Sequence, residues 1–393
     1  MSSALARLAS PVGRASLYHF TVYLPGAVAG VFLAIWLAEH GVSPEEIGLI
    51  NSAPVLVLLA INMVVGRLAD RAKDWRSVII IVSMLSALAP IGLFFVSEFW
   101  GIALVWLLCT VPGGLVPPLT DAATLRLAKR SGTDFGTIRA WGTIGYVVAS
   151  VGVGVVGGYF GAAAFVPLFV GLSVARAGIA LLLPRFRAPE PVVTLTSVAI
   201  EKPKLSASLK LWFVLPLIGF AIVNSNNAVL GGFGALVWHN NGIPSSYIGP
   251  LFAIAATAEA LIMVFWRRFG GRITARNMIL AAAVASLVRF FIMGFNPPVE
   301  VLFFTQALHA ICFGMGYFGV VHFIANWTSE DIAAEAQGFA NMLQQGASFI
   351  SLSLFGILVA HFGGAAFFAS SLFSVVGIVC VLISLKLKPP KEA

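Results

Sequence analysis

Long apolar stretches recur along the whole chain, and they restrict its fold more than any other feature of the sequence. They approach or exceed the roughly 20 residues that an α-helix needs to cross the hydrocarbon core of a bilayer. A helix satisfies its backbone hydrogen bonds within its own segment, whereas membrane strands would show a strict alternation that is absent here. The stretches predict transmembrane helices at residues 16–38, 46–66, 77–97, 101–124, 138–158, 163–183, 211–236, 247–267, 278–296, 299–325, 336–361 and 365–386.

The composition agrees with lipid as the solvent of this all-α membrane protein. Apolar residues make up 59% of the 393 residues and charged residues only 10%, against about 25% charged residues in soluble domains. The first apolar stretch has no clear small-residue cleavage site, so we interpret it as a retained helix and not as a signal peptide. The three cysteines lie in apolar stretches without neighbouring ligand groups, so we expect no disulfide, metal or other cofactor.

The basic residues are distributed unevenly between the links that join the predicted helices. All but Arg176 and Arg289 of the 24 Lys and Arg residues lie in, or at the edges of, links that share one side with both termini. By the positive-inside rule, both termini are expected in the cytoplasm of a multi-pass inner-membrane protein. The net charge of +8 therefore reflects topology, and we expect no nucleic-acid partner.

The longest polar stretch divides the chain into two similar halves. We expect an N-terminal six-helix bundle over residues 1–184, a cytoplasmic linker over 185–210 and a C-terminal six-helix bundle over 211–393. The basic segment 66–71 after the second helix has a counterpart at 267–272 after the eighth. Two pseudo-symmetric halves favour a transporter that exposes a midplane site to either side in turn.

The segment Gly66-Arg67-Leu68-Ala69-Asp70-Arg71 resembles the loop motif of the major facilitator superfamily. The resemblance implies that fold, and it implies that Gly66, Asp70 and Arg71 form a conformational motif that holds cytoplasmic helix ends together in the outward-facing state. The following residues, 73–76, depart from the usual Gly-Arg-Arg ending. A basic turn that only sets topology remains the alternative for this segment.

Ionisable residues inside the apolar stretches are the candidate functional groups, because charge is costly there. Asp121 and Arg139 lie close to the link between the fourth and fifth helices and are expected to pair. Glu259, Arg289 and His309 lie on three consecutive helices and suggest a converging cluster. A carboxyl in a low-dielectric cavity holds a proton readily, and histidine titrates near neutrality, whereas arginine stays charged. A static ion pair that only packs helices is the alternative.

The segment Thr120-Asp121-Ala122, followed by Asp134-Phe135-Gly136-x-x-Arg139-x-Trp141-Gly142, resembles the oligosaccharide:proton symporter branch of the superfamily, with its lactose permease-like and phenylpropionate permease-like members. The resemblance implies substrate binding by Asp121 and Arg139, and it places Glu259, Arg289 and His309 at the branch's glutamate, arginine and histidine positions. Cys312 and Gln306 replace the branch's coupling glutamate and a lysine. Proton coupling is therefore expected at Glu259, Asp121 or His309.

Amides in the predicted helices have two open interpretations. Asn227, which we include among the substrate-binding candidates with Asp121, Arg139, Arg289 and His309, and its neighbours can line a pathway or can join helices by hydrogen bonds. Arg176, in the sixth helix, has no explanation from the sequence. The chain has no Gly-rich phosphate loop and no paired nucleophile and base, so we expect neither ATP-driven transport nor an enzyme.

Together these features predict a secondary active transporter, with proton-coupled symport of a small, phenylpropionate-like organic acid by alternating access. Proton symport of a sugar or nucleoside and efflux of hydrophobic compounds are alternatives within transport. A membrane sensor or assembly factor without transport is the alternative from another class. The expected partners are a small-molecule substrate, protons and the lipid bilayer, and we expect a monomer.

Overall fold

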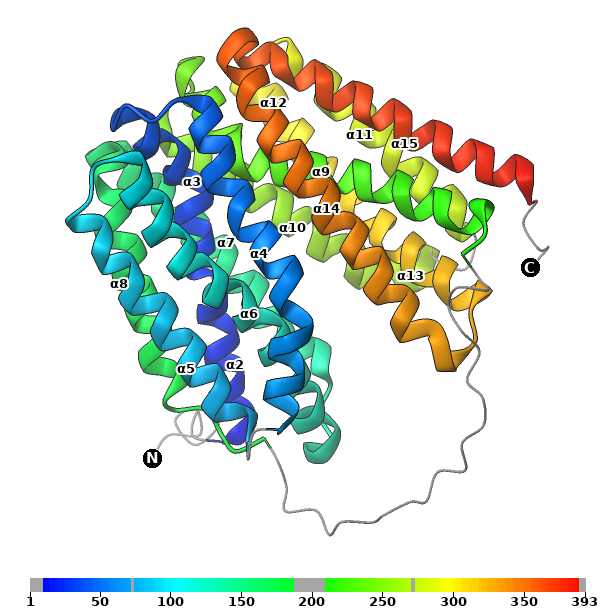
Figure 1. The fold of residues 1–393 in the computed structure, drawn as a ribbon, viewed down its shortest axis with the longest axis horizontal. Helices are drawn as coiled ribbons and strands as arrows, with labels where there is room; N and C mark the ends of the chain where they lie inside the picture. The colour runs from blue at the N-terminus through cyan, green and yellow to red at the C-terminus, as the bar shows by residue number, and fades with distance from the viewer. Residues whose placement is uncertain (1–9, 72–73, 187–208, 270–272, 389–393) are drawn as a thin grey trace. The chain divides into compact units, whose positions relative to one another are not determined.

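The structure is a computed structural model that describes residues 10–71, 74–186, 209–269 and 273–388. The side chains of residues 62–71, 266–269, 330–331 and 334 lie outside this description. Within the described ranges, every regular element is a helix (Figure 1), which confirms the predicted all-α fold. The chain divides into two units, Met1–Val193 with Pro244–Ala253 and Thr194–Ile243 with Ile254–Ala393.

Ten stretches of the described chain are long and apolar enough to cross a membrane. Two of them, Phe135–Ala180 and Glu335–Leu387, have 46 and 53 residues, and each contains two helices joined by a 3₁₀ turn. The stretches are therefore consistent with the twelve predicted crossings. The sequence-based division at 184 and 211 stays a proposal, and residues 187–208 of the expected linker lie outside the described residues.

The helices of the first unit are α2 (Pro11–Val22), α3 (Leu24–Glu39), α4 (Pro44–Arg71), α5 (Trp75–Leu88), α6 (Phe99–Ser131), α7 (Phe135–Phe160) and α8 (Phe165–Ala180), with 3₁₀ turns η1 (Ala89–Phe94) and η2 (Gly161–Ala164). The first predicted helix is thus two helices. Pro25 has no N–H to donate to Thr21, and Tyr23 leaves helical geometry with its own N–H bonded to that carbonyl. The break lets the side chain of Tyr23 turn toward α7.

A close approach of α2 to α7 depends on one glycine. A Cβ at Gly145 would overlap the carbonyl oxygen of Phe20, so only glycine allows the two backbones to meet there. The contact lies beside a core cluster that includes Tyr18, Val116 and Ile138, from α2, α6 and α7. Packing of this kind fixes the faces of α2, α6 and α7 that carry polar side chains.

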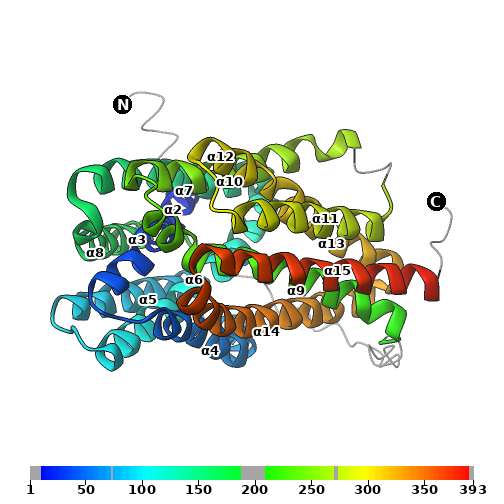
Figure 2. The same cartoon turned by 90° about the horizontal axis from the view of Figure 1, so that it is seen from above.

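The helices of the second unit are α9 (Leu211–Asn240), α10 (Ser245–Phe269), whose residues up to Ala253 belong to the first unit, α11 (Ala275–Gly294), α12 (Val299–Ala307), the π-helix η5 (Ala310–Met315), α13 (Gly316–Trp327), α14 (Glu330–Phe362), the 3₁₀ turn η6 (Gly363–Ala366) and α15 (Phe367–Leu387). Figure 2 shows α9, α11, α14 and α15 side by side. Asn226 joins three of them, because its amide donates to Ser370 O and Ser374 Oγ at 3.0 Å and to Ser286 Oγ at 3.3 Å. This amide therefore joins helices, the second of its two predicted roles.

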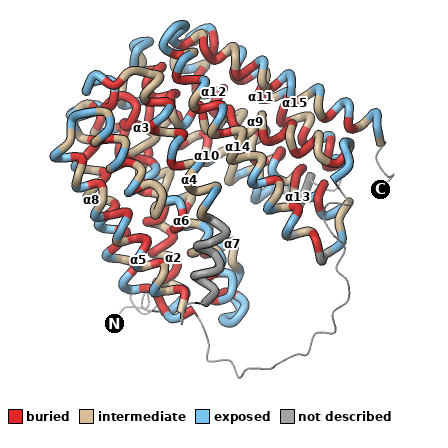
Figure 3. The backbone as a smooth tube through the Cα atoms, viewed as in Figure 1, coloured by how far each residue is buried: buried red, intermediate tan, exposed pale blue. Residues whose placement is uncertain are grey.

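Exposed residues occur along the described helices, as the pale blue segments of the tube in Figure 3 show, and they include many large apolar side chains. On α5, Ile81, Leu85 and Leu88 are 57%, 53% and 60% exposed, at a spacing that places them on one helical face. A stripe of this kind is unfavourable in water, and it matches the acyl chains of a bilayer.

Candidate functional site

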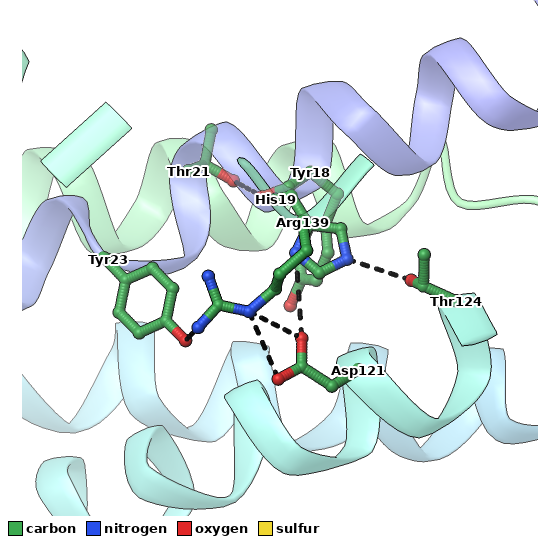
Figure 4. Close-up of polar contacts among 7 residues, drawn as sticks. All are labelled: Tyr18, His19, Thr21, Tyr23, Asp121, Thr124 and Arg139. Atoms are coloured by element: carbon green, nitrogen blue, oxygen red, sulfur yellow. Dashed lines mark hydrogen bonds and ion pairs between the residues drawn. The ribbon is translucent and has the colours of Figure 1, made fainter. Parts of the chain in front are cut away.

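Each unit contains a cluster of polar and ionisable side chains inside its helices. The first cluster contains Asp121 on α6 and Arg139 on α7. The Arg139 Nε lies 3.1 Å from Asp121 Oδ1 and donates to Oδ2 at 3.3 Å. Figure 4 shows the guanidinium extended over the carboxylate. The structure thus brings together the two residues expected to pair.

The hairpin between α6 and α7 explains why these two side chains meet. Gly132 ends α6 with a positive φ of 67°, which glycine adopts without steric cost. Asp134 then caps α7 by accepting from Thr137 N at 2.8 Å. The hydrogen bonds from the backbone N–H and the hydroxyl of Thr137 hold the pKa of the exposed Asp134 carboxyl below its usual value. The tight turn leaves Asp121 and Arg139 at one level of neighbouring helices.

Two side chains of α2 and its break complete the first cluster. The Arg139 Nη2 donates to Tyr23 Oη at 2.7 Å, and the guanidinium lies 5.0 Å from the centre of the same ring. His19 lies with Nδ1 4.0 Å from Asp121 Oδ1 and Nε2 3.0 Å from Thr124 Oγ1 (Figure 4). The candidate site residues chosen from the sequence did not include Tyr23 or His19. As an ionisable residue in an apolar stretch, His19 carried the same signal as Asp121.

The second cluster is centred on Arg289 of α11, which is fully buried. Its Nη2 donates to Gln306 Oε1 at 2.7 Å, and its Nη1 donates to Asn227 Oδ1 at 3.0 Å. The same Nη1 lies 3.2 Å from His309 Nδ1, and on the other side of that ring Nε2 lies 3.3 Å from Glu259 Oε2. Arg289, His309 and Glu259 thus form a chain in which the imidazole separates the arginine from the carboxylate.

The order of this chain restricts where the protons of His309 lie. Arginine only donates hydrogen bonds, so a bond between Arg289 and His309 requires Nδ1 to accept and leaves the proton on Nε2, toward Glu259. Nδ1 also lies 3.2 Å from Asn227 Oδ1, which only accepts. A second proton on the ring would therefore turn Nδ1 from an acceptor for Arg289 into a donor for Asn227.

The π-helix begins directly after His309, and such local widening is frequent at functional sites. Gly314 within the π-helix and Gly316 directly after it allow this segment to approach its neighbours. A Cβ at Gly316 would overlap the ring of Phe220 on α9, and one at Gly314 would come within 2.6 Å of Ile262 on α10. Cys312, at the position of the branch's coupling glutamate, is buried within this segment and supplies no carboxylate.

The segment predicted to be a conformational motif, residues 66–71, lies at the end of α4. Its backbone continues this helix to Arg71, and the side chains of Gly66, Asp70 and Arg71 lie outside the described residues. The residues that depart from the usual motif join α5 to the chain after α8. Asp74 caps α5 and accepts from Phe186 N at 3.1 and 3.2 Å, and Arg76 Nη2 donates to Leu181 O at 2.7 Å.

A search of the described residues for His, Cys, Asp and Glu groups that could hold a metal finds none. The two clusters contain charged groups, hydrogen-bond donors and acceptors, and side chains that can exchange protons. The structure does not test the roles assigned to the individual residues, and these stay predictions.

Comparison of the chain with known proteins identifies its family. The MFS_1 like family matches residues 17–370. The chain is 26% identical over 377 residues to a protein of Escherichia coli K12 named probable 3-phenylpropionic acid transporter, covering 92% of this chain and 94% of that one. It is 24% identical over 376 residues to a maltose permease of Geobacillus stearothermophilus, covering 94% and 93%.

Solved structures share the fold. A nucleoside transporter, NupG, superposes with a TM-score of 0.78 at 18% identity, covering 97% of this chain and all of that one. A D-xylose-proton symporter superposes with a TM-score of 0.67 at 16% identity, covering 98% and 97%. The chain therefore belongs to the MFS_1 like family of the major facilitator superfamily, and it is a multi-pass secondary transporter.

Proposed function

We propose that the chain carries small organic acids with an aromatic body, of the phenylpropionate class, together with protons across a bacterial inner membrane. The observation that carries the proposal is the chain Arg289–His309–Glu259. Among the described residues, the fully buried Arg289 has hydrogen bonds to the amides of Asn227 and Gln306 and to the imidazole of His309, and this histidine stands between it and the carboxylate of Glu259. Such a group has a positive charge for a substrate carboxylate and two sites that can take up a proton.

Proton uptake and substrate binding are coupled through His309 in this proposal. When the Glu259–His309 pair takes up a proton, either His309 becomes an imidazolium that donates from Nε2 to Glu259, or Glu259 becomes a carboxylic acid that donates to Nε2 while the ring proton lies on Nδ1. In both cases Nδ1 becomes a donor and turns from Arg289 toward Asn227. Arg289 then loses one acceptor, and a substrate carboxylate can replace it. The charge of the anion is offset by the proton, so the loaded site is closer to neutral and crosses the membrane at a lower electrostatic cost.

The first cluster contributes substrate contacts in the proposal. Asp121 and Arg139 already neutralise each other, and their side chains are 35% and 32% exposed, so they can exchange hydrogen bonds with a ligand without leaving an isolated buried charge. The relative named as a probable 3-phenylpropionic acid transporter supports the acid class. We also propose alternating access with both termini cytoplasmic, a monomer, and Gly66, Asp70 and Arg71 as the motif that holds helix ends.

A neutral solute is the second candidate. A carboxylate and a guanidinium that are partly exposed suit the hydroxyl groups of a sugar or nucleoside, which both donate and accept hydrogen bonds. The maltose permease among the relatives is in keeping with this candidate. In this case Arg289 would remain a structural group, and the proton would still be carried by Glu259 or His309.

Gradient-driven uptake tests the proposal. The purified chain is reconstituted into liposomes with an imposed inward proton gradient, and uptake of 3-phenylpropionate, maltose and uridine is measured with and without an uncoupler. We expect uncoupler-sensitive uptake of the acid. Protein-free liposomes are the control, because the protonated acid crosses lipid unaided. Uptake of only maltose or uridine would show that the substrate is a neutral solute and not the acid. No uptake of any of the three compounds would contradict symport.

A further inference from the structure

Arg176 of α8 is a buried charge that neither cluster uses. It is 5% exposed, and the ion pairs of the described residues do not include it. Its Nη1 donates to Val22 O at 3.2 Å and its Nη2 to Ser86 Oγ at 2.6 Å, while its Nε is buried without a hydrogen-bond partner. A guanidinium has five N–H donors, so two neutral acceptors leave most of its donor capacity and its whole charge uncompensated.

The guanidinium lines a cavity inside the first unit. The cavity has a volume of about 200 Å³, which is roughly seven times the volume of a water molecule in the liquid, about 30 Å³. Its wall includes Tyr23, Trp106, Thr110, Gly113, Phe169 and Arg176. The rings of Trp106 and Phe169 contact each other at 5.3 Å between centroids and form an apolar wall. The cavity therefore combines one cation with an aromatic surface, which suits a small molecule with an anionic head and an apolar body.

A glycine keeps the space beside the guanidinium open. A Cβ at Gly113 would lie 4.0 Å from Arg176 Nη2 and 3.7 Å from Ser86 Cβ, at ordinary contact distance. An alanine at this position would fill space next to the cation without displacing a neighbour. The same wall contains Tyr23, whose hydroxyl accepts from Arg139, so the cavity adjoins the Asp121–Arg139 pair through one side chain.

We infer that this cavity is a second carboxylate site, in which Arg176 binds the anionic head of an aryl monocarboxylate and Trp106 and Phe169 contact its ring. The inference rests on the proposed function for its ligand class, and it adds a site that the two clusters do not contain. Arg139 already has Asp121 as its counter-charge, whereas Arg176 has none among its contacts. Through Tyr23, a bound acid would also change the contacts of Arg139.

Equilibrium binding of labelled 3-phenylpropionate to the purified full chain in detergent tests this site. We expect Arg176→Gln to weaken one class of sites at least tenfold, and Gly113→Ala to weaken the same class severalfold while leaving the hydrogen bonds of Arg176 in place. The control is Gly178→Ala on α8, the helix that carries Arg176, where a Cβ meets open space. This variant should bind the acid like the unmodified chain. The neutral analogue 3-phenylpropanamide should compete at least tenfold more weakly than the acid, and chloride should compete more weakly still.

Four results would overturn the site. The first is unchanged acid binding in a monodisperse Arg176→Gln chain, which would leave Arg176 as a structural cap for Val22 O. If that variant aggregates, unchanged binding in Gly113→Ala or equal competition by acid and amide has the same meaning. Chloride that competes as well as the acid would reduce the site to a simple anion site. If the chain takes up the acid with protons but Arg176→Gln binds it normally, this inference alone is overturned. If acid binding depends on Arg176 but no proton-driven uptake occurs, the proposed function alone is overturned.

Discussion

The two polar clusters use the same kinds of side chain in different orders. In the first unit, the carboxylate of Asp121 contacts the guanidinium of Arg139 directly, and about a third of each side chain is exposed. In the second unit, Arg289 is fully buried, and the imidazole of His309 separates it from Glu259. The direct pair cannot take up a proton without freeing its arginine. In the second unit, a proton taken up by the Glu259–His309 pair lets the imidazole exchange Arg289 for Asn227 as its partner, and for this reason we propose that proton coupling takes place in the second unit.

Among the substitutions that test this difference between the clusters, replacement of Glu259 is expected to have the largest effect on transport. At an imposed gradient of two pH units, one proton per substrate supports accumulation of about 100-fold, since each unit corresponds to a factor of ten. Glu259→Gln keeps the shape but takes up no proton, so accumulation should fall to about the external concentration. Counterflow, the exchange of labelled for unlabelled substrate without a gradient, should persist.

Both measurements use the liposomes of the uptake assay. Glu300→Gln, in the first turn of α12, is the matched control because it makes the same chemical change outside both clusters. Accumulation by Glu259→Gln at the level of the unmodified chain would move proton coupling away from Glu259. His309→Gln and Asp121→Asn, measured in parallel, would then show whether the proton is carried in the second or the first cluster, by which of the two loses accumulation.

Replacement of each arginine by lysine sharpens the comparison with a smaller effect. Lysine keeps the charge but loses the planar fork that lets Arg289 donate to Gln306 and Asn227. For a buried, multiply bonded group, we expect KM for the acid to rise about 10- to 100-fold in Arg289→Lys. At Arg139, which is partly exposed, the pair is worth about 1 kcal/mol, so Arg139→Lys should raise KM by less than about tenfold. The reverse order of the two effects would show that burial does not rank the clusters.

A single hydrogen bond distinguishes Tyr23 from a packing residue. Tyr23→Phe removes the 2.7 Å bond to Arg139 and keeps the ring. A hydrogen bond to a partly exposed charge contributes about 1 kcal/mol net, so the affinity for substrate should fall about fivefold, as measured by equilibrium binding. Tyr159→Phe, at an 82% exposed position at the end of α7, is the control and should leave affinity unchanged. Equal affinity in both variants would mean that the hydroxyl of Tyr23 does not contribute to substrate binding.

The sequence predicted the membrane spans and the main members of both clusters for simple physical reasons. Twenty apolar residues imply a helix in lipid, and a charge inside such a stretch implies a partner, so Asp121, Arg139 and His309 stood out from their surroundings. Helix ends were less predictable. The fourth predicted helix ended at 124, whereas α6 continues to Ser131, because a helix does not stop where hydropathy falls.

Features that depend on packing between distant segments were not predictable. Pro25 accompanies the break between α2 and α3, yet Pro112, Pro117 and Pro118 lie inside the continuous α6, so proline alone does not locate a break. The π-helix after His309 and the cavity at Arg176 depend on which helices lie side by side. Arg176 was visible as an unexplained charge, but its cavity is formed by side chains from α2, α3, α5, α6 and α8.

The smallest expected effect concerns how the first cluster is held in place. Asp134 caps α7, the helix that carries Arg139, and the hydrogen bonds from Thr137 hold its pKa below the usual value. A carboxyl with a lowered pKa in the folded state stabilises the fold above its unfolded pKa of about 3.9, and this contribution is lost as the pH falls through the lower, folded value. Asp134→Asn keeps a capping side chain but does not titrate. The unfolding midpoint of the unmodified chain should therefore fall relative to that of the variant only below about pH 4, by at most about 2 °C. A midpoint difference that stays constant from pH 3 to 6 would mean that the charge of Asp134 does not contribute, and that the α6–α7 turn alone positions Arg139.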